Sequence, residues 1–163
     1  MNDASQGATL VGRQVPDFSA ASTAGEFVLS RQAGRILVLY FYPKDNTPGC
    51  TTESRDFAAA HRAFEAAGAA VIGVSRDTIA SHERFAQKFE LPFVLISDPD
   101  EALCGLFGVM KMKNMYGKAV RGIERSTFLI DARGVVRREW RDVKVPGHVD
   151  EVLQAVQALA RPA

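Results

Sequence analysis

Two cysteines are the residues of this chain best suited to covalent chemistry. Cys50 follows Thr47, Pro48 and Gly49, and this order predicts a helix with Thr47 as N-cap and Pro48 at its first position. Cys50 would then lie in the first helical turn, where unpaired N–H groups and the helix dipole stabilise a negative charge. A thiol held there is favoured as the thiolate, which is the nucleophilic form.

The local sequence leaves two interpretations of Cys50 open. The hydroxyl of Thr47 could approach the sulfur from the same turn, donating one hydrogen bond and accepting another, which suits a reactive thiolate. The alternative is a small buried residue behind an ordinary helix start. Cys104, among the apolar residues of segment 101–107, fits the buried interpretation.

Hydrophobic periodicity predicts the elements that must position these cysteines. An unbroken apolar run at 36–42 predicts a strand covered on both faces, ended by Pro43. Other strands are predicted at 69–75, 93–97, 127–131 and 135–140, an N-terminal β-hairpin at 15–22 and 26–30, a helix from Cys50 toward Gly68, helices at 79–89, 101–107 and 148–159, and a basic loop at 111–121. This order predicts an α/β three-layer sandwich on a mixed sheet. Cys50 would follow the C-terminal end of a central strand, where such sheets usually carry function.

Composition narrows the class of protein. The 163 residues, 47% apolar and 24% charged, predict one globular domain over residues 1–163, with residues 1–10 flexible. The net charge of +1 gives no electrostatic reason to expect nucleic acid or an anionic membrane as partner. The N-terminus lacks the pattern of a secretory signal, and the longest apolar run is too short to span a bilayer, so we expect a cytoplasmic protein.

The spacing Pro43-x-x-x-Thr47-x-x-Cys50 resembles the active-site pattern of the peroxiredoxins. The longer string from Tyr42 to Glu53 resembles their bacterioferritin comigratory protein branch, also called peroxiredoxin Q. Further segments similar to that branch lie at 74–77, 91–93, 97–100, 107–109, 122–131 and 146–148. The resemblance covers nearly the whole chain, roughly residues 11–159.

The resemblance implies a thioredoxin-like fold and the reduction of hydrogen peroxide and organic hydroperoxides. It makes Cys50 the peroxidatic nucleophile, with Thr47 hydrogen-bonded to the sulfur and the peroxide and Pro43 shielding the pocket from water. Arg125 would reach the same pocket, where a guanidinium stabilises the thiolate and the charge that develops on the O–O bond. Glu53 would support the helix start or orient Arg125.

No cofactor or metal is expected. The reaction needs no flavin or nucleotide, and the sequence shows no phosphate loop and no metal-ligand cluster. The three histidines, His61, His82 and His148, are predicted to be ordinary helix residues.

The sequence departs from the branch at the second, resolving cysteine. Many members carry it five residues after the first, where this chain has Arg55, and others carry it in the next helix, where segment 78–90 has no cysteine. We therefore expect a one-cysteine cycle, in which an external thiol, either glutathione with glutaredoxin or thioredoxin, reduces a Cys50 sulfenic acid. Cys104 is the only remaining candidate for an internal resolver.

Other functions stay open from sequence alone. A thiol–disulfide oxidoreductase would normally use a C-x-x-C pair, which this chain lacks. A peroxide sensor or a holdase-type protein would use Cys50 as a switch without efficient turnover. The expected oligomeric state is a monomer or a weak homodimer.

Overall fold

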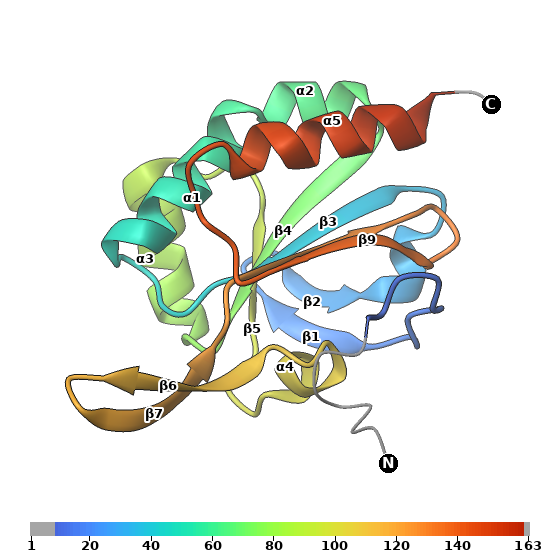
Figure 1. Cartoon of the computed structure of the whole chain (residues 1–163). Coiled ribbons are helices and arrows are strands. Elements are labelled where there is room, and N and C mark those ends of the chain that lie inside the picture. Colours follow the sequence, from blue (N-terminus) through green and yellow to red (C-terminus); the bar gives the residue numbers. More distant parts are fainter. Residues whose placement is uncertain (1–8, 162–163) are drawn as a thin grey trace, which may run out of the picture.

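A seven-stranded mixed sheet forms the centre of the computed structural model, which describes residues 9–161 (Figure 1). Its spatial order is β2 (Gly25–Val28), β1 (Ser19–Ser22), β5 (Val94–Ser97), β4 (Ala69–Ser75), β3 (Ile36–Phe41), β8 (Ser126–Ile130) and β9 (Val136–Arg141). Strands β3, β4 and β5 run parallel, whereas β1, β8 and β9 pair antiparallel with their neighbours. The mixed sheet and the β1–β2 hairpin confirm the predicted architecture.

Helices cover both faces of the sheet. The longer ones, α1 (Pro48–Ala59), α3 (Ile79–Phe89) and α5 (His148–Ala160), lie on one face together with α2 (His61–Ala66) (Figure 1). The short helices α4 (Ala102–Leu106) and η1 (Leu29–Gln32) pack on the other face. These two helical layers and the sheet form the predicted three-layer α/β arrangement.

The alternation of side chains along β3 divides the core in two. Leu37, Leu39 and Phe41 join the apolar cluster that contains α4 and η1. Val38 and Tyr40 belong to the second cluster, which includes the buried faces of α1, α2, α3 and α5. Because successive side chains of a strand point to opposite faces, the two clusters lie on opposite sides of the sheet.

The basic segment 111–121 is not the predicted loop. It forms most of an antiparallel hairpin of β6 (Met110–Met115) and β7 (Lys118–Ile123), which extends from the body of the molecule (Figure 1). Tyr116 and Gly117 both have positive φ angles, 54° and 80°. Such two-residue turns match the twist of paired strands, so an exposed, lysine-rich hairpin forms where charge alone suggested irregular structure.

The predicted long helix from Cys50 toward Gly68 is interrupted. It divides into α1 and α2 at Ala60, whose φ and ψ of −95° and 4° are not helical. Phe57 and Phe64, on either side of the interruption, remain fully buried with ring centroids 5.8 Å apart. The other predicted helices and strands are present, with ends shifted by a few residues.

Most of the N-terminal segment predicted to be flexible, residues 1–8, lies outside the described residues; the N–H of Leu10 donates to Oε1 of Glu139 at 2.8 Å. Within residues 9–161, no helix is long and apolar enough to cross a membrane.

Candidate active site

Cys50 lies in the first turn of α1, just after the C-terminal end of β3. Thr47 is the N-cap, in an extended conformation, and Pro48 is the first helical residue, as the sequence predicted. Pro43, half-buried, follows the end of β3 and begins the loop that leads to this helix. The Cys50 side chain is 1% exposed and reduced, so the helix N-terminus acts on a sulfur shielded from bulk water.

The hydroxyl of Thr47 does not bond the sulfur in this structure. Its Oγ1 donates to the carbonyl of Lys44 at 2.9 Å, closing the turn before α1, and it caps no helical N–H. The backbone carbonyl of Thr47 accepts the first helical bond, from the N–H of Thr51 at 2.8 Å. Because a hydroxyl has a single proton, a hydrogen bond donated to the sulfur or to the peroxide requires this hydroxyl to rotate.

The side chain of Arg125 contacts the sulfur of Cys50. Its Nη2 lies 3.5 Å from Sγ of Cys50. The sheet register explains this approach, since Ser126 pairs with Phe41 and Arg125 therefore arrives at the end of β3 where the Cys50 loop begins. Gly49 leaves room for the guanidinium, because a Cβ at that position would lie 3.1 Å from Nη2.

Glu53 lies one helical turn after Cys50 and completes this group. It is fully buried, and its Oε1 accepts from Nη1 of Arg125 at 2.7 Å, so one guanidinium joins the carboxyl and the sulfur. Burial raises the pKa of Glu53 to about 7, although the charge of Arg125 acts in the opposite direction. Near neutral pH a large fraction of Glu53 is protonated, which reduces the repulsion that a carboxylate would exert on a thiolate at Cys50.

Cys104 lies on the other side of the sheet. Its side chain is fully buried in the cluster with Leu39 and Phe41, whereas Cys50 belongs to the cluster with Val38 and Tyr40. Burial, reinforced by the Asp98 carboxylate, raises the pKa of the Cys104 thiol well above its ordinary value. A disulfide requires Cα atoms within about 7 Å, and the sheet stands between these two thiols.

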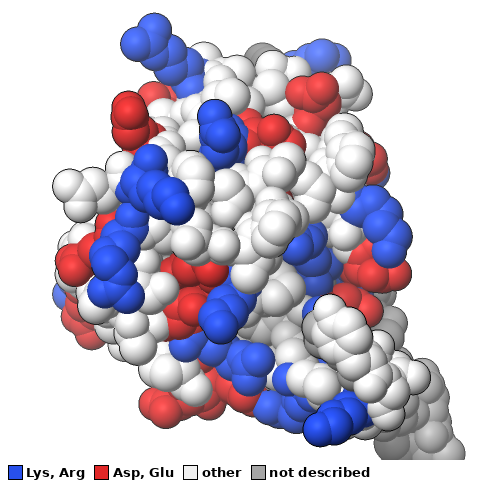
Figure 2. Space-filling view, turned by 90° about the vertical axis from the view of Figure 1, so that its left-hand side faces the viewer, with Lys and Arg blue, Asp and Glu red and all other residues white. Residues whose placement is uncertain are grey.

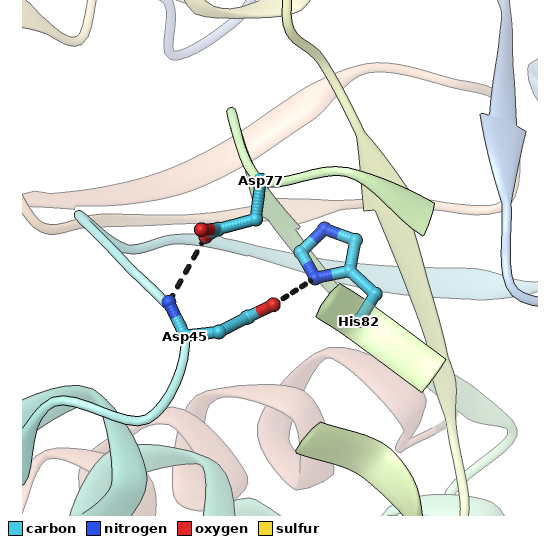
Figure 3. Close-up of side chains that lie close together, drawn as sticks. All are labelled: Asp45, Asp77 and His82. Carbon is cyan, nitrogen blue, oxygen red and sulfur yellow. Dashed lines mark hydrogen bonds and ion pairs between the residues drawn. The ribbon is translucent and has the colours of Figure 1, made fainter. Parts of the chain in front are cut away.

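A second polar cluster lies beneath the Cys50 loop and consists of Asp45, Asp77 and His82 (Figure 3). His82 is fully buried, with Nδ1 2.7 Å from Oδ2 of Asp45. Asp77 Oδ2 accepts from the N–H of Asp45 at 2.9 Å. One potential ligand atom from each residue lies within 4.8 Å of the others, a spacing compatible with a cation. In the structure, the side chains of Asp45, Asp77 and His82 all form hydrogen bonds with other protein groups.

Two histidines are therefore not the ordinary helix residues that the sequence predicted. His82 belongs to this cluster, and His148 is 5% exposed with Nε2 2.8 Å from Oγ1 of Thr127. A signal for His82 existed, since it shares the apolar side of α3 with Phe85 and Phe89 at helical spacing. Its acceptor Asp45 is 37 residues away, and the sequence contains no indication of that pairing.

Comparison with known proteins agrees with the family resemblance found in the sequence. The model of the AhpC/TSA family matches residues 11–139. Peroxiredoxin Bcp of Xanthomonas campestris is 57% identical over 133 residues, covering 82% of this chain and 83% of that protein. Peroxiredoxin Bcp of Bacillus subtilis is 47% identical over 151 residues, covering 92% and 96%.

Solved structures of peroxiredoxins are also similar to this chain over most of its length. Peroxiredoxin Q of Xanthomonas campestris superposes with a TM-score of 0.84 at 53% identity, covering 88% of this chain and 92% of that one. A mutant of PrxQ from Xylella fastidiosa gives a TM-score of 0.88 at 44% identity, covering 93% and 97%. These similarities confirm the thioredoxin-like fold. The chain therefore belongs to the AhpC/TSA family, in the peroxiredoxin Bcp or Q branch of thiol-dependent peroxidases.

Proposed function

We propose that this peroxidase reduces hydrogen peroxide and organic hydroperoxides through Cys50 as its nucleophile. The observation that supports this most directly is the 3.5 Å approach of Arg125 Nη2 to Sγ of Cys50 at the N-terminus of α1. The relative from Xanthomonas campestris has been described for its alkyl peroxide reduction activity, and its structure superposes with a TM-score of 0.84 at 52% identity.

The proposed first step forms a sulfenic acid. The Cys50 thiolate attacks one peroxide oxygen, an S–O bond forms, the O–O bond breaks, and the departing alkoxide or hydroxide takes up a proton to leave as alcohol or water. Arg125 stabilises the thiolate beforehand and the charge on the leaving oxygen during the attack. Glu53 orients Arg125 through its 2.7 Å ion pair.

Thr47 and Pro43 have narrower roles in this proposal. Thr47 turns its hydroxyl from the Lys44 carbonyl toward the peroxide, accepting or donating a hydrogen bond as the oxygens separate. Pro43, half-buried after β3, restricts water at the site. None of these steps uses a metal or an organic cofactor.

The proposed return step uses an external thiol. One thiol attacks the sulfenic sulfur, releasing water and forming a mixed disulfide, and a second thiol displaces Cys50 and leaves as the oxidised disulfide. Cys104 is buried on the far side of the sheet and is not assigned a role. Because Cys50 is 1% exposed, the first turn of α1 must open before a thiol reaches it.

Glutathione with glutaredoxin, or thioredoxin, is the proposed source of electrons, and the cytoplasm is the proposed location. We propose a monomer or a weak homodimer that binds neither nucleic acid nor membrane.

Basic and acidic side chains are interspersed on the face that carries α3 and the β6–β7 hairpin (Figure 2). This pattern, with a net charge of +1, supports the absence of a nucleic-acid partner.

Peroxide consumption by the wild type, Cys50→Ser and Cys104→Ser tests the proposal, with dithiothreitol, glutathione plus glutaredoxin, or thioredoxin as reductant. We expect no turnover from Cys50→Ser and sustained turnover from Cys104→Ser, and the reductant that supports turnover identifies the partner. If Cys104→Ser stops after one equivalent, Cys104 resolves the sulfenic acid and the one-cysteine cycle is wrong. If the wild type stops after one equivalent with every reductant, the protein is a sensor.

A further inference from the structure

His82 is a buried residue whose two ring nitrogens both face acceptors. Nε2 lies 2.9 Å from the carbonyl oxygen of Ile96, which can only accept, so Nε2 carries a proton. Nδ1 lies 2.7 Å from Oδ2 of Asp45. Burial raises the pKa of this carboxyl, but hydrogen bonds from His82, Tyr42 and Ser81 bring it below its ordinary value. The two hydrogen bonds of the ring fix His82 between Asp45 and the Ile96 carbonyl.

Asp45 is held at its side chain and at its backbone. Its carboxylate accepts from Tyr42 Oη at 2.6 Å and from Ser81 Oγ at 2.8 Å, in addition to His82. Its N–H donates to Oδ2 of Asp77 at 2.9 Å. The donors and acceptors come from the end of β3, from the segment after β4 and from α3. The residue is therefore fixed relative to three parts of the fold (Figure 3).

This anchoring acts on the turn that leads to Cys50. Asn46, directly after Asp45, has a φ of 62°, a conformation that few residues other than glycine adopt and that surrounding contacts must maintain. Thr47 follows as the N-cap of α1, and its hydroxyl closes the same turn on the Lys44 carbonyl. The path of the chain from Asp45 thus decides where the first turn of α1, and the sulfur, lies relative to Arg125.

We propose that His82 is a positioning residue for peroxide reduction, which holds the Asp45 turn and thereby aligns Cys50 with Arg125. The inference rests on the proposed role of Cys50. His82 touches neither the sulfur nor the peroxide; it acts through Asp45. Loss of either partner would leave the other polar group buried without its hydrogen bond, which would displace the turn.

Two half-reactions measured separately test this role. In His82→Gln and in Asp45→Asn we expect single-turnover oxidation of Cys50 by peroxide to slow by about tenfold to a hundredfold, while reduction of the preformed sulfenic acid by dithiothreitol is not slowed. The double variant Asp45→Asn with His82→Gln replaces both partners by amides that can bond each other, so we expect it to react faster than either single variant. His61→Gln, a histidine on α2 outside the cluster, is the matched control and keeps the wild-type rate.

Equal oxidation rates in the folded single variants and the wild type would overturn the proposal, since a purely structural role lowers stability without changing the rate of folded molecules. If the wild type itself does not consume peroxide, the proposed function fails instead. Should the single variants not fold, nitrogen-15 NMR of the wild type decides, with His61→Gln and His148→Gln assigning the signals. A proton on Nε2 of His82, donated to the Ile96 carbonyl, and a hydrogen bond between Nδ1 and Asp45 are expected, and a ring that lacks either bond would refute the inference.

Discussion

Arg125 and Cys50 are 75 residues apart in the sequence, yet Nη2 of the arginine lies 3.5 Å from Sγ of the cysteine. The same guanidinium holds Oε1 of Glu53 through its other terminal nitrogen, at 2.7 Å. A planar group with donors in fixed directions can satisfy two such partners at once. The arrangement gives a positive charge of defined position beside a sulfur that is almost completely buried.

Replacing Arg125 by lysine should lower the second-order rate constant for peroxide by about a hundredfold. An ammonium is a point charge on a flexible stem and cannot bond Glu53 and Cys50 in the same geometry. Competition for peroxide against a haem peroxidase measures the rate. Arg137→Lys is the matched control, because Arg137 is about half exposed and forms a surface ion pair with Asp131. A wild-type rate in a folded Arg125→Lys variant would contradict the prediction.

Gly49→Ala should separate activity from stability. The new Cβ would lie 3.1 Å from Nη2 of Arg125, so the guanidinium has to move away and we expect peroxide reduction to slow. Alanine is favoured over glycine in a helix by about 1 kcal/mol, so the melting temperature should not fall. Gly105→Ala in α4, where a Cβ meets nothing within 4 Å, should leave the rate unchanged. A Gly49→Ala variant as fast as wild type would show that Arg125 is not required in this position.

Glu53→Gln should change how stability depends on pH. The pKa of Glu53 rises on folding from 4.5 to about 7, so the folded state binds a proton that the unfolded state has lost. The stability that this proton contributes is complete below about pH 4.5 and is lost as the pH rises through about 7, a change of roughly 3 kcal/mol. Urea unfolding from pH 5 to 8 should show the wild type losing stability relative to Glu53→Gln.

Parallel pH profiles for the wild type and Glu53→Gln would contradict this prediction. The matched control is Glu83→Gln, which removes an exposed carboxyl from α3.

His148→Gln should have the opposite effect. Burial lowers the pKa of His148 from 6.5 to about 4; the charge of Glu151 acts in the opposite direction, and the charge of Arg125 lowers the pKa further. Neutral His148 therefore contributes stability that is present above about pH 6.5 and is lost as the pH falls toward about 4, amounting to roughly 3 kcal/mol. Urea unfolding from pH 5 to 7 should show a smaller loss on acidification in His148→Gln than in the wild type. The same loss in both proteins would disprove the assignment, and His61→Gln is the control.

Local sequence determined where the nucleophile candidate lies. The apolar run at 36–42, the helix start at Thr47 and Pro48, and the cysteine two residues later placed Cys50 in the first turn after β3, because strand burial and helix capping depend on neighbouring residues. The motif around Cys50 also identified the family. The charged segment 111–121 misled the prediction, since charge does not distinguish an exposed hairpin from a loop.

Only the tertiary structure decided which distant side chains meet. The register of β8 against β3 brings Arg125 to Cys50, and the alternation along β3 puts Cys104 on the opposite face. The packing of α3 beneath the Cys50 loop joins His82 to Asp45, 37 residues away. These relationships depend on sheet pairing and on the faces that helices bury. Neither property is encoded in any short stretch of residues, because both arise when the whole core is assembled.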